Sequence, residues 1–166
     1  QWGENCLSKL NGMFAFAIYD NKRKKIFLAR DRAGEKPLFY YFKNNSLYFG
    51  SELKTLLSNP NLPRYIDEVS FDSYLSMGYV PGNRCILKNY NKLPPAHALT
   101  YEINTNKLNL CKYWKIPELL NRDEEKNEDH LLEELELLLN QSISRQLVAD
   151  VPVGVLLSGG VDSSLI

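Results

Sequence analysis

The sequence predicts an α+β region built on antiparallel sheets, followed by the beginning of an α/β domain. Up to about residue 114, short runs rich in aromatic and apolar residues alternate with polar turns, a pattern typical of antiparallel strands. Residues 117–129 are rich in charge and poor in bulky apolar side chains, which is typical of a linker between domains. The remainder has the order helix, apolar run, glycine pair and new helix, which opens an α/β domain.

Two hairpins begin the antiparallel region. Residues 12–20 are apolar enough for a strand buried on both faces, and Lys25–Arg30 returns as the next strand after a polar turn. Residues 38–43 and Ser46–Gly50 form the clearest hairpin, because the two asparagines between them tolerate the positive φ angles of a two-residue turn.

Short helices and a last hairpin complete this region. The second of these helices places Phe71, Tyr74 and Leu75 on one face. The expected elements are helices over 52–57 and 70–77, a loop over 31–37, an irregular segment over 86–95, and a hairpin of 97–103 with 107–114.

One amphipathic helix is expected from the end of the linker to Ala149. Its apolar residues recur at spacings of three and four, so we expect one buried face, and Asn127 or Asp129 caps its start. The residues that form two rows along this helix are Leu131, Leu135, Leu138 and Ser142, and Leu132, Leu139, Ile143 and Leu147.

Residues 151–157 are a short apolar run and predict a buried strand.

Composition limits the class of protein. The chain has 20 basic and 20 acidic residues, so its net charge indicates neither a nucleic-acid partner nor an anionic membrane, and we expect neither. Three widely spaced cysteines, Cys6, Cys85 and Cys111, suit free thiols in a reducing cytoplasm better than a disulfide framework. The apolar runs are shorter than the roughly 20 residues that a membrane-spanning helix needs.

The predicted organisation is a first domain over 1–116, a linker over 117–129 and the beginning of a second domain over 130–166. The sequence opens on Gln1 and closes on Ile166, one turn into the last expected helix. We therefore expect a segment of a longer chain.

The most informative motif lies between the predicted strand 151–157 and the last helix, where open α/β sheets bind ligands. Its glycines let the backbone approach a bulky anion, and backbone N–H groups and serine hydroxyls add donors for phosphate oxygens. An acidic residue in such a cradle makes sense if Mg²⁺ bridges it to the phosphates. The motif consists of Ser158, Gly159, Gly160, Val161, Asp162, Ser163 and Ser164.

This motif is not a Walker A loop. Gly160 stands where that loop carries its lysine, so the turn is poorly equipped to hold a γ-phosphate for transfer. A wide turn lined by hydroxyls suits a pyrophosphate better. The alternative is a Gly/Ser surface turn that binds no ligand. The predicted strand directly before the turn argues against this alternative.

The motif S-G-G-x-D-S-S after an apolar strand resembles the pyrophosphate loop of the N-type ATP pyrophosphatases, and within that group the chain resembles asparagine synthetases. The family usually has glycine where Ala96 stands. The segments that carry the resemblance are 150–157 (DVPVGVLL), 10–17 (LNGMFAFA), 29–38 (ARDRAGEKPL), 51–54 (SELK) and 93–97 (LPPAH).

The resemblance implies that 1–116 is the later part of a class II glutaminase domain, an α/β/β/α fold of the N-terminal-nucleophile type, and that 130–166 begins an ATP-pyrophosphatase domain. It implies that Leu156 contacts the adenosine end of ATP through its backbone, that residues 158–164 bind the pyrophosphate, and that Asp162 ligates Mg²⁺. The implied reaction activates aspartate as β-aspartyl-AMP, which ammonia from glutamine then attacks.

In the family the glutaminase nucleophile is an N-terminal cysteine, upstream of the matching segments, so we expect no catalytic residue in 1–166 and no activity from this segment alone. A cytoplasmic enzyme with glutamine and aspartate as substrates is expected, and a homodimer is compatible with the resemblance. Two alternatives stay open: an amidotransferase ligase of the β-lactam synthetase kind, and a non-catalytic descendant that acts as a binding module.

Other polar residues have plainer interpretations. The cysteines are expected to be structural or exposed thiols, and His97 and His130 to lie at the start of a strand and of a helix without a catalytic role. Three charged residues at strand ends are expected to form an ion-paired network that shapes an interdomain face. They are Arg30, Asp31 and Glu52.

Overall fold

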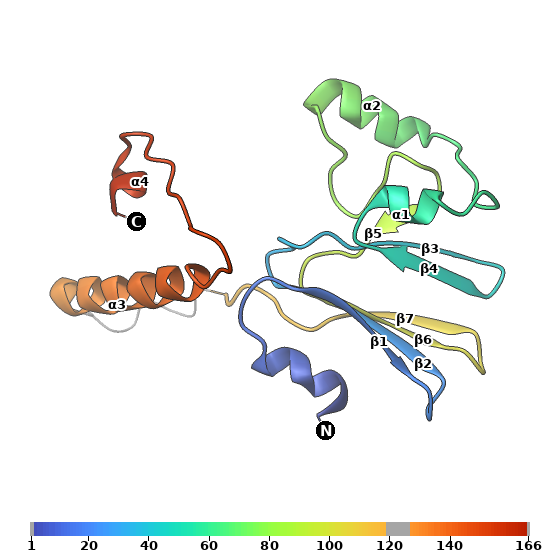
Figure 1. Ribbon diagram of the computed structural model, residues 1–166, viewed down its shortest axis with the longest axis horizontal. Coiled ribbons are helices and arrows are strands. Elements are labelled where there is room, and N and C mark those ends of the chain that lie inside the picture. The colour runs from blue at the N-terminus through green and yellow to red at the C-terminus, as the bar shows by residue number, and fades with distance from the viewer. Residues whose placement is uncertain (1, 119–126, 166) are drawn as a thin grey trace. The chain divides into compact units, whose positions relative to one another are not determined.

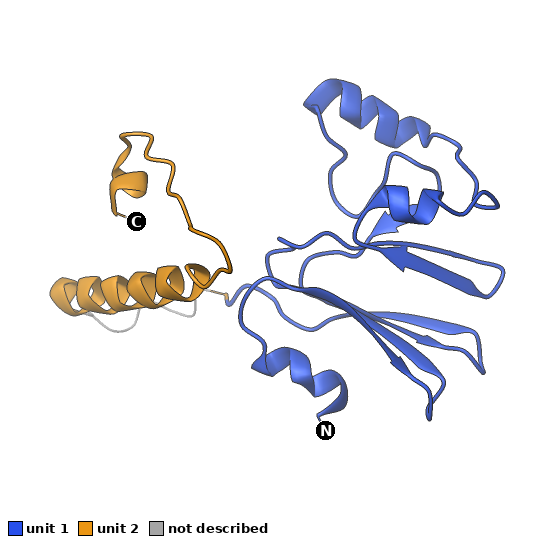
Figure 2. Cartoon of the chain, in the orientation of Figure 1, with its two compact units in different colours: residues 1–117 blue, residues 118–166 orange. Residues whose placement is uncertain are grey.

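The computed structural model describes residues 2–118 and 127–165. The chain divides into two compact units, residues 1–117 and residues 118–166 (Figure 2). Of the predicted linker 117–129, the central part, 119–126, lies outside the described residues. Within the described ranges, none of the helices has both the length and the apolar character needed to cross a membrane.

The first sheet of unit 1 confirms two of the predicted strand pairs. It contains β1 (Ala15–Asp20), β2 (Lys25–Arg30), β6 (His97–Glu102) and β7 (Lys107–Lys112), in the order β1-β2-β6-β7 (Figure 1). All its pairings are antiparallel. The two hairpins β1–β2 and β6–β7 are local in sequence, whereas the β2–β6 pairing joins segments far apart in the chain.

The second sheet has the order β4-β3-β5, with β3 (Phe39–Lys43), β4 (Ser46–Gly50) and β5 (Tyr90–Lys92). Its β3–β4 hairpin is confirmed, and Asn44 and Asn45 have φ angles of 50° and 56°, as a two-residue turn of this kind requires. The short strand β5 lies in a segment predicted to be irregular. That prediction was wrong because three residues, two of them Asn and Lys, carry no strand pattern, and only the pairing with β3 makes the strand.

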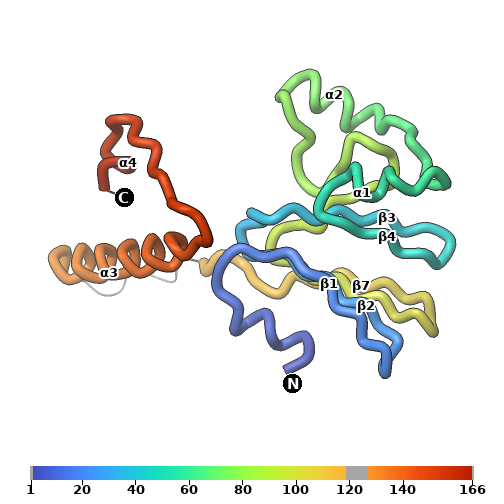
Figure 3. Tube along the Cα trace, viewed as in Figure 1, coloured from blue at the N-terminus to red at the C-terminus, as the bar shows by residue number. Residues whose placement is uncertain are grey.

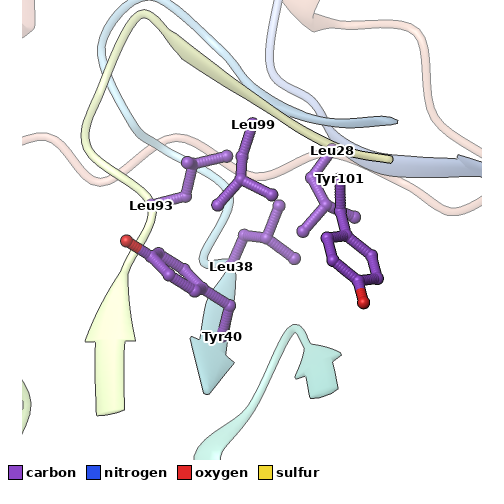
Figure 4. Packing of buried hydrophobic residues seen from close by; sticks show 6 residues of the cluster. All are labelled: Leu28, Leu38, Tyr40, Leu93, Leu99 and Tyr101. Carbon is purple, nitrogen blue, oxygen red and sulfur yellow. The ribbon is translucent and has the colours of Figure 1, made fainter. Parts of the chain in front are cut away.

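The two sheets enclose the main core of unit 1 (Figure 4). Leu28, Leu93 and Leu99 are completely buried there, and each such side chain contributes roughly 1.5–3 kcal/mol on burial. Leu28 and Leu99 lie on the neighbouring strands β2 and β6, and Leu93 directly follows β5. The buried members of this cluster are Leu28, Leu38, Tyr40, Leu93, Leu99 and Tyr101.

Helical segments cover the outer faces of both sheets, as the tube trace also shows (Figure 3). The 3₁₀ helix η1 (Gly3–Lys9) places Leu7 against Phe27 of β2. The helix α1 (Leu53–Leu57) places Leu56 in the cluster that covers the outer face of the second sheet. Antiparallel sheets with accompanying helices are therefore confirmed for unit 1.

The helix α2 (Glu68–Met77) begins two residues before its predicted start. The side chain of Asp67 accepts a hydrogen bond from the backbone N–H of Ser70 at 2.9 Å, and Gly78 ends the helix at a φ angle of 77°. The apolar face predicted for this helix is exposed, because the described residues do not cover it. The exposed fractions are 43% for Phe71, 49% for Tyr74 and 67% for Leu75.

The prediction that 12–20 is buried on both faces was wrong. The strand β1 pairs only with β2 among the described strands, so it forms an edge of its sheet. Ile18 and Tyr19 in its second half are 49% and 56% exposed. An apolar run shows that a segment favours burial, but it does not show how many neighbours the segment has.

Unit 2 contains the predicted long helix as α3 (Glu128–Gln146). The side chain of Asn127 caps it by accepting from the backbone N–H of Asp129 at 3.0 Å, as predicted. The predicted burial of one face is not observed, because none of the described residues of α3 is buried.

The prediction of a strand over 151–157 was also wrong, because the structure shows no strand at these described residues. A strand requires a hydrogen-bonding neighbour, and none of the segments described in 127–165 pairs with this one. The helix after the glycine pair is present as α4 (Val161–Leu165).

Candidate functional site

The glycine-serine turn before α4 is held together by its own hydroxyl groups. The Oγ atoms of Ser158 and Ser163 lie 2.9 Å apart. The hydroxyl of Ser163 lies 3.0 Å from the carbonyl oxygen of Gly160, and the hydroxyl of Ser164 donates to the same oxygen at 2.9 Å. The turn therefore gathers three hydroxyl groups around Gly160.

Of the two glycines, Gly159 is the one that the backbone conformation favours. It has a φ angle of 78°, in the left-handed region that favours glycine. At Gly160, an added Cβ atom would lie 3.4 Å from the Oγ atom of Ser158, an ordinary van der Waals contact, so space alone does not require glycine there.

Other residues of the predicted site stand apart from this cluster. Leu156 is 97% exposed and Val161 is 85% exposed. Asp162 is exposed in the first turn of α4, and no hydrogen-bond or ion-pair partner is found for its carboxylate in the described part of the chain. The structure thus brings together Ser158, Gly160, Ser163 and Ser164. In contrast, Leu156, Val161 and Asp162 are exposed and lie outside this cluster.

The charged residues predicted as an ion-paired network in unit 1 are organised differently. The guanidinium of Arg30 donates to backbone carbonyls rather than to a carboxylate: Lys36 at 2.8 Å, Leu93 at 2.7 Å, and Gly34. Glu52 pairs with Lys54 at the surface instead. The prediction of an ion-paired network was wrong, since sequence spacing gives no sign that an arginine will bind main-chain groups.

Asp31, the residue after Arg30, is buried and only 1% exposed. Its carboxylate accepts backbone N–H groups of Glu35 at 2.9 Å, Lys36 at 3.0 Å and Phe14 at 3.3 Å. Burial by itself raises the pKa of Asp31, but these backbone donors outweigh it and hold the pKa below its ordinary value. The ionised carboxylate therefore organises the loop after β2.

The cysteines and histidines show no catalytic arrangement in the described residues. Cys6, Cys85 and Cys111 are free thiols, as predicted, and Cys85 is buried. His97 begins β6, with Nδ1 2.7 Å from the carbonyl oxygen of Pro95. His130 lies in the first turn of α3.

Sequence reasoning missed an open depression of about 590 Å³ in unit 1. It lies between the start of α2, the end of β3 and the segment around β5, and its charged lining residues are Lys43, Asp67 and Arg84. These three residues are far apart in the sequence, so no local motif could have indicated the depression.

Comparison with known proteins assigns unit 1 to a family. Residues 1–114, well over half of the chain, match the family described as the glutamine amidotransferase domain. The chain belongs to this family. Residues 134–166 match a second family, described as asparagine synthase.

The relatives of this chain include proteins named as glutamine-hydrolysing asparagine synthetases. "Asparagine synthetase [glutamine-hydrolyzing] 3" of Bacillus subtilis (strain 168) is 39% identical over the whole chain, which spans 26% of that relative. "Putative asparagine synthetase [glutamine-hydrolyzing] 2" of Methanocaldococcus jannaschii is 36% identical over 99% of the chain and 32% of the relative.

Not every relative carries that name. "Amidase chry2" of Gibberella zeae is 31% identical over 98% of the chain and 24% of the relative. The chain thus spans about a quarter to a third of the length of these curated relatives.

Proposed function

We propose that this chain is part of a glutamine-dependent asparagine synthetase that consumes ATP. The observation that supports this most strongly is the order of two family matches in one chain, a glutamine amidotransferase domain over 1–114 and asparagine synthase over 134–166. The hydroxyl-lined turn 158–164 lies within the second match. One module would release ammonia, and the other would activate the acceptor.

The proposed domain organisation is an N-terminal-nucleophile glutaminase domain over 1–116, a linker over 117–129 and the beginning of an α/β ATP-pyrophosphatase domain over 130–166. Its support in unit 1 is the pair of antiparallel sheets. In unit 2 the support is the glycine pair followed by α4. A cytoplasmic location and a homodimer stay predictions.

The turn 158–164 is the proposed pyrophosphate site. The hydroxyls of Ser158, Ser163 and Ser164 gather around Gly160, and each can donate to an oxygen of a bound anion. Glycines at 159 and 160 keep the backbone accessible to that anion. The backbone of Leu156, a residue that is 97% exposed, is the proposed contact for the adenosine end of ATP.

Asp162 is the proposed ligand of Mg²⁺. The described residues contain no group of three or more acidic, histidine or cysteine side chains that could enclose a metal ion. A single carboxylate still fits Mg²⁺, because this ion commonly binds one or two carboxylates together with phosphate oxygens and water. When bound, the ion neutralises charge that develops on the phosphates.

The proposed reaction has two steps. A carboxylate oxygen of aspartate attacks the α-phosphorus of ATP, so that β-aspartyl-AMP forms and pyrophosphate leaves. Ammonia from glutamine then attacks the activated carbonyl, AMP leaves, and asparagine forms. In the first step the role of the turn 158–164 is to orient the pyrophosphate and hold it as it becomes the leaving group.

Transfer of label from glutamine tests this proposal. With glutamine carrying ¹⁵N in its amide, aspartate and ATP, the complete enzyme is expected to form asparagine labelled in the amide. Omission of ATP is expected to abolish the transfer while glutamine hydrolysis continues. Label that appears in the amide of another carboxylic acid, or no use of glutamine at all, contradicts the proposal and favours a ligase with a different acceptor.

A further inference from the structure

The segment 11–13 connects η1 with β1 in unit 1, and all three of its residues are exposed. The chain is held on both sides of it. The backbone N–H of Leu10 donates to the carbonyl of Leu7 at 3.4 Å. Phe14 donates its backbone N–H to the carboxylate of Asp31 at 3.3 Å and accepts the backbone N–H of Asp31 at 2.8 Å. The exposed segment is therefore a short free connection between two fixed ends.

The peptide group between Asn11 and Gly12 is unrestrained within the described part of the chain. There, neither the side-chain amide of Asn11 nor the backbone N–H of Gly12 has a hydrogen-bond partner. A Cβ atom added to Gly12 would meet no other atom within 4 Å. The φ angle of Gly12 is 127°, which glycine adopts without the penalty that a side chain brings. This peptide group can therefore rotate without breaking a contact.

An asparagine followed by glycine carries both partners of an intramolecular reaction. The backbone nitrogen of Gly12 attacks Cγ of Asn11 and forms a five-membered succinimide, while the Cγ–Nδ2 bond breaks and ammonia leaves with the proton of the attacking nitrogen. Water then adds to one of the two ring carbonyls and breaks its bond to the ring nitrogen, so that aspartate or isoaspartate forms. Because one chain holds both groups, the remaining requirement is a backbone that can reach the cyclic geometry.

We propose that Asn11 is a site of spontaneous deamidation in the folded protein. It is the one asparagine in the sequence that precedes a glycine. The missing Cβ atom of Gly12 removes the steric obstacle to ring closure, and its backbone N–H has no hydrogen bond to break before the attack. The isoaspartate product adds a carboxylate and lengthens the main chain by one carbon between the fixed ends of this connection.

Asn45 provides a comparison within the same unit. It is exposed and precedes another small residue, Ser46. Its surroundings differ, because Ser46 begins β4 and pairs with Lys43, and the carbonyl of Asn45 accepts the hydroxyl of Tyr101 at 2.6 Å. Ring closure at Asn45 therefore requires the β3–β4 turn to open first, so the fold protects this asparagine.

The test incubates the complete enzyme in mildly alkaline buffer, folded and in urea, because loss of its proton makes the backbone nitrogen nucleophilic. Mass spectrometry of peptides measures deamidation at both asparagines, and enzymatic methylation of the new carboxyl group detects isoaspartate. The rate at Asn11 in the folded enzyme is expected to lie within about threefold of the rate in urea. Folding is expected to slow the reaction at Asn45 at least about tenfold.

The matched variant is Asn11→Gln, which keeps an exposed amide but would need a six-membered ring. It is expected to stay unmodified at this position in both conditions and to melt at the wild-type temperature. Deamidation at Asn11 that occurs only in urea, or in neither condition, overturns the proposal. Equal slowing of Asn11 and Asn45 by folding also overturns it, as does a glutamine at position 11 that deamidates as fast as Asn11.

Discussion

Replacement of Asp162 by asparagine in the complete enzyme is expected to lower aspartate-dependent pyrophosphate release by roughly a hundredfold or more. Asparagine keeps the shape of the side chain but removes the charge that would hold Mg²⁺ against the phosphates. Neutralisation of charge by a metal ion supplies several kcal/mol in the transition state, and about 1.4 kcal/mol corresponds to tenfold in rate. Asp162 has no structural partner among the described residues, so the exchange should leave the fold intact.

The control for this prediction is the other reaction of the same enzyme. Glutamine hydrolysis is assigned to a different domain and should be nearly unchanged by Asp162→Asn, whereas general unfolding would damage both reactions. Asp150→Asn, at an exposed position in the same unit, serves as the matched variant and should retain pyrophosphate release. Near wild-type release by Asp162→Asn would show that Asp162 is not a metal ligand.

Replacement of Asp31 by asparagine is expected to lower the free energy of unfolding of unit 1 by about 2–4 kcal/mol. The carboxylate accepts three backbone N–H groups in a buried position, and an amide offers one oxygen and two further donors in the same place. The loss is measurable by urea unfolding with tryptophan fluorescence. Both tryptophans of the chain, Trp2 and Trp114, lie in unit 1, so the signal reports this unit.

The same residue predicts a dependence on pH. Because the pKa of Asp31 is lowered in the folded state, its contribution is fully present above the ordinary pKa of aspartate, about 4, and is lost as the pH falls through the lowered value. Asp31→Asn should therefore flatten the acid side of the stability curve. Asp20→Asn, which removes a carboxylate that also accepts backbone N–H groups but lies at an exposed turn, should have a much smaller effect. Equal effects of the two variants would contradict the role of Asp31.

Local signals in the sequence predicted the local structure of this chain well. The paired asparagines between β3 and β4 and the asparagine before α3 act through their own side chains and backbone angles, so their roles follow from a few neighbouring residues. The strand β5 and the hydrogen bond from Arg30 to the carbonyl of Leu93 depend on segments more than 40 residues away in the chain. No local pattern encodes such pairings.

The candidate site divides in the same way. The hydroxyl cluster of the turn 158–164 arises within seven residues, so a local motif contains all the residues that form it. Its role as a pyrophosphate site stays a prediction. The hydrogen bonds that Tyr113 donates to the carbonyls of Arg30 and Ala96 were not predicted, because these residues are far apart in the sequence and meet only in the folded chain. Ala96 stands where glycine is usual in the family that the sequence resembles. In the structure Ala96 has a left-handed φ angle, so the change has a conformational cost.

The products of ATP provide the most direct test of the proposed pyrophosphate site. The complete enzyme would be incubated with ATP, Mg²⁺, aspartate and either glutamine or ammonium, and its phosphorus-containing products followed by ³¹P NMR. A turn that holds pyrophosphate as the leaving group predicts AMP and pyrophosphate in amounts equal to the asparagine formed. ADP and inorganic phosphate as the primary products would contradict the assignment of the turn 158–164.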